Sequence, residues 1–301
     1  ARGWRLLSAL YLHGPVGDVL PALRAVPPLA DALPDPFDRD EADAEHHRLF
    51  GLEVFPYASV FLERDGALGG RVRDAVARIG GDAGAPGRDA GVEPDHLGHE
   101  LRLLALLTER RDEDAVSRLL QGHLLWWLPV FVHSALRHAG SFWTAVLRLT
   151  LEAALDQVGT GAPVAGDSPS AAGGPGSPPH PPGALGDPVE DPTSRRETGV
   201  AELARYLVTP ARSGLFLSLG DARALGRASD VPGGFGRRER VVATLLRSAA
   251  AYGRLGRVSS DLTAMADAQA AFVVRIPRSY REPWLARLER LRSVLGRLGT
   301  A

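Results

Sequence analysis

The sequence predicts an all-α fold, and three observations support this prediction. Apolar residues recur every three or four positions along most of the chain, which is the period of a helix. We find no series of short segments with the alternating pattern of strands. With 301 residues, of which 45% are hydrophobic, the chain can bury a sizeable core. This pattern predicts a bundle of roughly ten helices.

The central part of the chain carries the clearest helical pattern. Helices are expected over 94–108, 112–139 and 141–158, with a kink at Pro129 because proline removes a helix hydrogen bond. The prolines between 27 and 36 predict a loop there. The segment 54–62 is rich in β-forming residues but contains Pro56, so we expect an ordered loop over the core.

The composition changes after residue 158. About a quarter of the segment 159–194 is proline and nearly as much is glycine, and it has no aromatic residue. Such a segment buries too little apolar surface to offset its ordering entropy. We therefore predict an N-terminal helical section (1–158), a disordered or loosely packed linker (159–198) and a C-terminal helical section (199–301).

Charge and residue usage exclude several classes of protein. The formal net charge is −1, whereas a broad nucleic-acid surface needs a basic excess. Cysteine is absent, which removes thiolate chemistry and Cys-ligated metals. The most apolar stretch, 124–132, is shorter than the roughly 20 residues that span a bilayer, and the first residues do not read as a signal peptide. We expect a soluble cytoplasmic protein without stable membrane insertion, either monomer or dimer.

The segment Glu93-Pro94-Asp95-His96 is the most informative motif. Proline is favoured at the first position of a helix, and acidic residues are favoured near its N-terminus, so the segment can simply start a helix. Alternatively, Asp95 and His96 project from the first turn into a groove, where a carboxylate, an imidazole and free backbone N–H groups hold a peptide.

A metal site is a second interpretation of the same region. Glu93 and His96 have the Glu-x-x-His spacing of di-iron helical bundles, and His99 and Glu100 lie close by. A helical-bundle metalloprotein or enzyme would use these four residues. Two features disfavour it, because Pro94 makes Glu93 a cap and no second Glu-x-x-His is present.

The stretch from His123 to Phe131 is strongly apolar and predicts a buried helix. Trp126 and Trp127 are adjacent, so they cannot both face the same core, and one of them is expected to line a groove. No phosphate-binding loop, which would need a lysine, and no Gly-x-Ser-x-Gly elbow is present. We therefore expect no cofactor and no enzymatic activity.

Taken together, several motifs resemble the TorD/DmsD family of redox-enzyme maturation chaperones. The strongest is Glu93-Pro-Asp-His-Leu-Gly-His-Glu-Leu101, preceded by the Pro56 to Leu62 stretch and followed by the His123 to Phe131 stretch. After the linker, Thr209-Pro-x-x-Ser213-Gly-Leu-Phe-Leu217 also matches. The linker and the last helix, 280–298, are longer than the family pattern.

The resemblance implies a TorD-like helical chaperone and no catalytic residues. Such proteins bind the twin-arginine signal peptide, and often the body, of a molybdopterin oxidoreductase apoprotein, and hold it back from export until its cofactor is loaded. Asp95 and His96 fall on family positions linked to signal-peptide recognition. A receptor for two guanidinium groups beside an apolar helix should offer carboxylates next to an aromatic groove, so we add Glu93, Glu100, Trp126 and Phe131 to the predicted site. A helical adaptor for another partner is the remaining alternative.

Overall fold

The computed structural model describes residues 1–85, 91–160, 181–189, 191–192 and 199–299, and these residues are helical with no β-strand. The prediction of an all-α fold is confirmed. The helices are α1 (Arg2–His13), α2 (Leu20–Arg24), α3 (Pro27–Ala32), α4 (Arg39–His46), α5 (Ala58–Leu62), α6 (Gly70–Asp82), α7 (Leu97–Arg110), α8 (Glu113–Leu119), α9 (Leu125–Leu136), α10 (Ser141–Thr160), α11 (Val200–Val208), α12 (Pro210–Ser213), α13 (Leu219–Ala228), α14 (Arg238–Ala251), α15 (Leu255–Val273) and α16 (Arg278–Gly299).

Two of the predicted loops contain short helices. Pro27 and Pro28 start α3 instead of breaking the chain, because proline is well suited to the first position of a helix, where its missing N–H is not needed. The segment 54–62 runs extended through Pro56 and then forms α5 from Ala58. These two helices account for part of the difference between the roughly ten helices predicted and those observed in the described residues.

The predicted kink at Pro129 takes the form of a π-helical turn further upstream. Pro129 lies inside α9, and the wider turn spans Leu120–Leu124 between α8 and α9. Proline cannot donate to the carbonyl four residues earlier, that of Leu125, and the irregular turn ends directly before this residue. Because a π turn adds a residue to the helix, it also sets the direction of His123.

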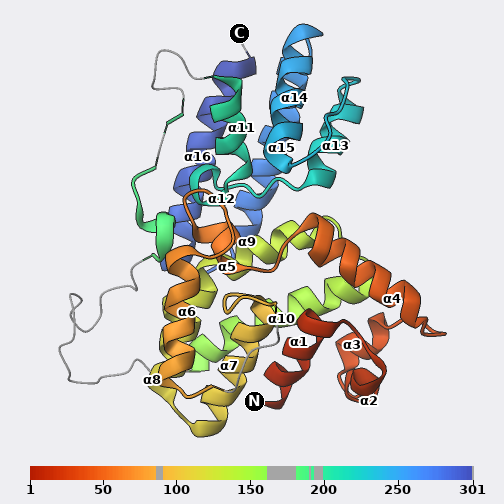
Figure 1. Ribbon diagram of the computed structural model, residues 1–301, viewed down its shortest axis with the longest axis vertical. Helices are drawn as coiled ribbons and strands as arrows, with labels where there is room; N and C mark the ends of the chain where they lie inside the picture. Colours follow the sequence, from red (N-terminus) through yellow and green to blue (C-terminus); the bar gives the residue numbers. More distant parts are fainter. Residues whose placement is uncertain (86–90, 161–180, 190, 193–198, 300–301) are drawn as a thin grey trace.

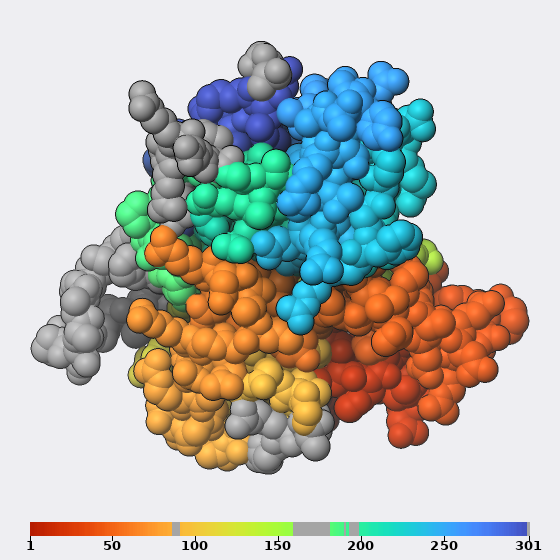
Figure 2. All heavy atoms as spheres, turned by 45° about the horizontal axis from the view of Figure 1, so that its top comes forward, coloured from red at the N-terminus to blue at the C-terminus, as the bar shows by residue number. Residues whose placement is uncertain are grey.

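The helices form two hydrophobic cores. The first is built mainly from residues 4–154, and the second from residues 203–295. In Figure 1 the helices of the first core lie in the lower part and α11, α13, α14, α15 and α16 in the upper part, with α9 at the junction. Phe216, Val273, Tyr280 and Trp284 enter the first core from the C-terminal section. The two sections therefore share apolar packing, and the space-filling view shows them in contact along a broad boundary (Figure 2).

The described part of the predicted linker is packed against the body. Most of 159–198 lies outside the described residues, but Gly183–Gly186 forms a 3₁₀ turn with Leu185 buried in the first core. Gly183 has φ +58°, and a Cβ there would lie 2.5 Å from the backbone oxygen of Leu62. Only glycine allows this close approach of the strap (residues 181–192) to α5. The described part of the strap is therefore packed, and the prediction for the rest of 159–198 lies outside the described residues.

Candidate functional site

Two separate motifs of the sequence meet at the start of α7. The backbone N–H of Leu97 donates to the carbonyl of Pro56 at 2.8 Å, and the N–H of Ala58 donates to the carbonyl of Asp95 at 2.9 Å. Tyr57 and His96 thus form an isolated antiparallel β-bridge. We call 93–97 the signature turn; it is held by the segment that leads into α5.

Asp95 is fully buried, and its side chain ties the two motifs together. Its Oδ2 accepts a hydrogen bond from the backbone N–H of Ser59 at 2.9 Å, in the first turn of α5. A carboxylate at a helix N-terminus satisfies a free N–H and interacts favourably with the helix dipole. The prediction that Asp95 projects into a groove is therefore wrong: its carboxylate caps α5, a helix from the other motif.

His96 is the N-cap of α7. Its Nδ1 accepts from the backbone N–H of Gly98 at 3.1 Å, so Nδ1 carries no proton. The ring lies edge-on to Tyr57, with 4.9 Å between the centroids. His96 is only 7% exposed, so it too shapes the turn from inside and does not line an open groove.

Glu100 and His123 form a buried pair beneath the turn. Nε2 of His123 lies 2.8 Å from Oε1 of Glu100, and both side chains are buried. Burial raises the pKa of Glu100, and the contact with His123 opposes this only in part. His123 also lines a pocket of ≈ 500 Å³ whose other walls include Glu63, Arg71 and Asp187.

Glu93 is the exposed carboxylate of the signature turn. Its side chain lies 3.5 Å from Arg73, and both groups are more than a third exposed, so this ion pair is weak. Glu93 and Arg73 line a pocket of ≈ 460 Å³ together with Asp74 and residues 91–94. Among the predicted acidic residues Glu93, Asp95 and Glu100, Glu93 is thus the one that a partner can reach.

Trp126 and Phe131 do not line an open aromatic groove as predicted, because both are core residues. Phe131 is fully buried and packs against Trp127 with 5.6 Å between ring centroids. Trp126 is covered by α16: its carbonyl accepts from Nε1 of Trp284 at 2.7 Å, and its ring contacts Tyr280. Both adjacent tryptophans are buried because they face different neighbours, Trp127 the first core and Trp126 the last helix.

The four residues of the metal interpretation do not converge. Glu93 faces Arg73, and Glu100 faces His123. His96 caps α7. Within the described residues, no group of three or more His, Cys, Asp or Glu side chains could hold a metal ion.

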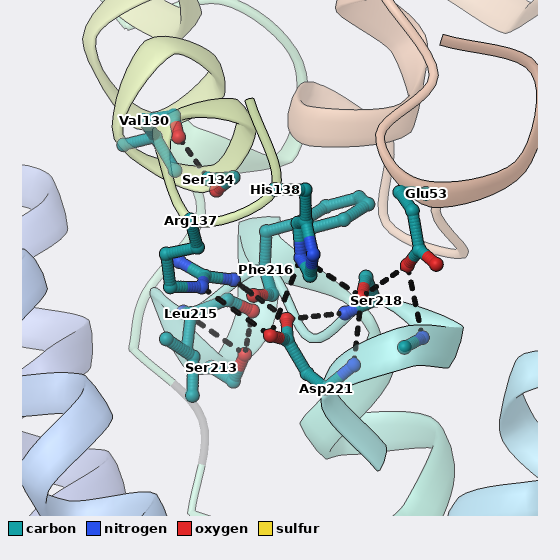
Figure 3. Close-up of polar contacts among 11 residues, drawn as sticks. Glu53, Val130, Ser134, Arg137, His138, Ser213, Leu215, Phe216, Ser218 and Asp221 are labelled. Carbon is teal, nitrogen blue, oxygen red and sulfur yellow. Dashed lines mark hydrogen bonds and ion pairs between the residues drawn. The ribbon is translucent and has the colours of Figure 1, made fainter. Parts of the chain in front are cut away.

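A second polar cluster joins the two sections where α9 meets α13 (Figure 3). Asp221 accepts from Arg137 at 2.8 Å and from the N–H of Ser218 at 2.9 Å, while the Ser218 hydroxyl donates to Glu53 at 2.8 Å. His138 lies 3.1 Å from that hydroxyl and 3.3 Å from Asp221. We call these five residues the junction cluster.

The junction cluster contains Ser, His and Asp but not the geometry of a catalytic triad. In a triad the carboxylate contacts Nδ1 of the histidine and the serine contacts Nε2. Here Ser218 and Asp221 both approach Nε2 of His138. Ser218 is fully buried and caps α13 in a capping box with Asp221. The cluster therefore fixes the junction of the two sections.

Gly98 sets the distance between α1 and the signature turn. A Cβ at this position would lie 2.5 Å from Cγ of Leu12 and 3.1 Å from the carbonyl of Ser8. We expect Gly98→Ala to lower the free energy of unfolding by about 1–2 kcal/mol, because overpacking outweighs the gain in helix propensity. Urea denaturation checks this, with Gly122→Ala as the matched control, since a Cβ there meets nothing within 4 Å. Equal stability of the two variants would contradict the tight contact.

The all-helical fold is consistent with the helical bundle of the redox-enzyme maturation chaperones that the sequence resembles. Residues 18–133 match the family described as "Nitrate reductase delta subunit", which confirms this resemblance and supports a molybdoenzyme maturation chaperone in general. The matched part ends within α9 and does not include the C-terminal section. None of the curated proteins matches the chain significantly. In the described residues, no helix is both long and apolar enough to cross a membrane.

Proposed function

We propose that this protein is a cytoplasmic chaperone that binds the twin-arginine signal peptide and the body of a molybdopterin oxidoreductase apoprotein and assists cofactor insertion before export. The observation that carries the proposal is the family match over 18–133, which includes all six predicted binding residues. The expected partner is a polypeptide, in keeping with a chaperone family and not with an enzyme.

The geometry of the signature turn supports different roles for its residues in this proposal. Glu93 is exposed beside a pocket and its pair with Arg73 is weak, so a guanidinium group of a signal peptide can displace Arg73 and form a bidentate contact. Asp95 and His96 are buried and act on the peptide only by holding the turn in place. They are positioning residues in this proposal, and Glu93 is the contact residue.

We expect Glu93→Gln to weaken binding of a twin-arginine leader about tenfold, the equivalent of roughly 1.4 kcal/mol, because a charge-assisted contact becomes a neutral one. The measurement is titration calorimetry with a synthetic leader peptide of a molybdopterin oxidoreductase from the same organism. A second peptide with Lys-Lys in place of Arg-Arg should bind wild-type protein more weakly, since lysine cannot make the bidentate contact.

Glu113→Gln is the matched control, because Glu113 is an exposed acidic residue in the first turn of α8. It should bind the leader peptide like wild type.

Asp95→Asn should lower the affinity for the leader peptide. In the same variant the amide of Ser59 should exchange its hydrogen faster, because it loses the carboxylate to which it donates. A folded Glu93→Gln variant with unchanged affinity would refute the role of Glu93, and a wild-type protein that binds neither leader would refute the proposed function.

A further inference from the structure

A groove of ≈ 350 Å³ lies between α1 and α7, the two helices side by side at the lower centre of Figure 1. The helices run antiparallel: Leu12, near the end of α1, lies against Gly98 at the start of α7, and Arg5 pairs with Glu109 near the end of α7. A groove between two antiparallel helices can receive a third helix along its length.

The floor of the groove is apolar. Ala9 and Leu12 from α1 face Leu103 and Leu106 from α7, and Leu12, Leu106 and Ala9 are only partly buried. Helical peptides are recognised in such grooves through apolar residues spaced three or four positions apart. The shape therefore fits the apolar stripe of an amphipathic helix.

The rim of the groove is cationic. Arg5 and His13 stand on α1 and are exposed, and Arg102 stands on α7, where a hydrogen bond of 2.9 Å to Nδ1 of His99 positions its guanidinium. None of the described residues that line the groove is acidic. Glu109 pairs with Arg5 at the outer end, but such an exposed pair is easily replaced. With two arginines and no acidic residue among the described lining residues, charge complementarity thus favours an anionic occupant.

We propose that the α1/α7 groove binds an acidic amphipathic helix of the client's mature polypeptide. This inference rests on the proposed function, and it adds a second site with the opposite charge preference. A twin-arginine leader is cationic and is disfavoured beside Arg5 and Arg102, whereas Glu93 favours it. The two sites therefore select different segments of one client.

The test uses two synthetic helical peptides with the same leucine stripe, one with glutamates and one with arginines on the flanks. In fluorescence anisotropy the glutamate peptide should bind at least about tenfold more tightly than the arginine peptide, and its affinity should fall when added salt shortens the screening length to roughly 3 Å. The double variant Arg5→Glu, His13→Glu should lose about tenfold or more of this affinity. Arg247→Glu, an exposed arginine on α14, should bind like wild type.

A second variant, Leu106→Ser, keeps the rim charges and should also weaken the glutamate peptide. Failure of the glutamate peptide to bind, equal affinity for both peptides, or wild-type affinity in the folded double variant would overturn the groove assignment. The twin-arginine leader reports on the other site. The affinity of the leader peptide should be unchanged or raised in the Arg5→Glu, His13→Glu variant. If wild-type protein binds the glutamate peptide but not the leader peptide, the result counts against the proposed function and not against the groove.

Discussion

Replacing Arg287 by methionine should lower the free energy of unfolding by about 3 kcal/mol or more, because several buried carbonyl groups lose their donor at once. The guanidinium of Arg287 is buried on α16 and donates to the carbonyl of Ala211 at 2.5 Å and to that of Pro283 at 3.1 Å. Its Nη2 also donates to the carbonyls of Ala184 and Asp187 at 2.9 and 3.0 Å. One side chain thus fastens the strap and α12 to the last helix.

The Arg287→Met variant tests this clamp in two ways. Urea denaturation measures the loss of stability, and limited proteolysis should show faster cleavage within 181–192, since the strap loses its main anchor to α16. Arg278→Met is the matched control, because Arg278 is on the same helix and its side chain is 83% exposed. Asp191 of the strap also pairs with Arg290 and Arg297 of α16. A variant that resists protease like wild type would show that these pairs and the buried Leu185 hold the strap without Arg287.

The sequence predicted the helical class and the presence of Arg287 on an amphipathic helix, but not the burial of this residue. A signal was present: Arg287 falls on the same helical stripe as Trp284 and Leu291, at spacings of three and four residues. An arginine on the apolar face of a helix has to find carbonyl or carboxylate partners inside the protein. Which segments supply them depends on tertiary packing, and here they are the proline-rich strap, α12 and α16 itself.

The signature turn illustrates the same limit. Pro94 and the acidic residues correctly predicted a helix start, but the helix begins at Leu97, because His96 supplies the cap through its side chain. The pattern of neighbouring residues could not show that Asp95 caps α5 and not its own helix. The cap depends on a hydrogen bond to Ser59, which lies 36 positions earlier in the chain. For Trp126 the separation is larger still, because the helix that covers it, α16, lies more than 150 residues later in the sequence.

The junction cluster leads to the second large effect, which concerns Asp221. Burial by itself would raise the pKa of Asp221, but hydrogen bonds from His138 and the charge of Arg137 outweigh burial and hold this pKa well below its usual range. Asp221→Asn removes the negative charge and leaves the partly buried guanidinium of Arg137 without its ion-pair partner. We expect a loss of about 3 kcal/mol in the free energy of unfolding.

The pH dependence separates this effect from other causes of instability. Because the pKa of Asp221 is lower in the folded state, its contribution is complete above the unfolded value of roughly 4 and is lost as the pH falls further. His133 acts in the same direction but over a higher pH range: burial lowers its pKa to about 4, so the folded protein loses stability from this group as the pH falls from roughly 6.5. The difference in stability between wild type and Asp221→Asn should therefore shrink only below about pH 4. The earlier loss occurs in both proteins and is larger in the variant, because the charge of Asp221 raises the pKa of His133 in the wild type.

Urea denaturation at several pH values measures this difference directly. Asp267→Asn is the matched control, because Asp267 also pairs with an arginine, Arg292, but is 58% exposed, and this variant should lie close to wild type at every pH. A difference between wild type and Asp221→Asn that is already lost above pH 5 would contradict the ionised state of Asp221 in the cluster. Arg137 and His138 follow α9, whereas Asp221 belongs to α13. A single urea transition that Asp221→Asn shifts as a whole would therefore show that the two sections unfold together.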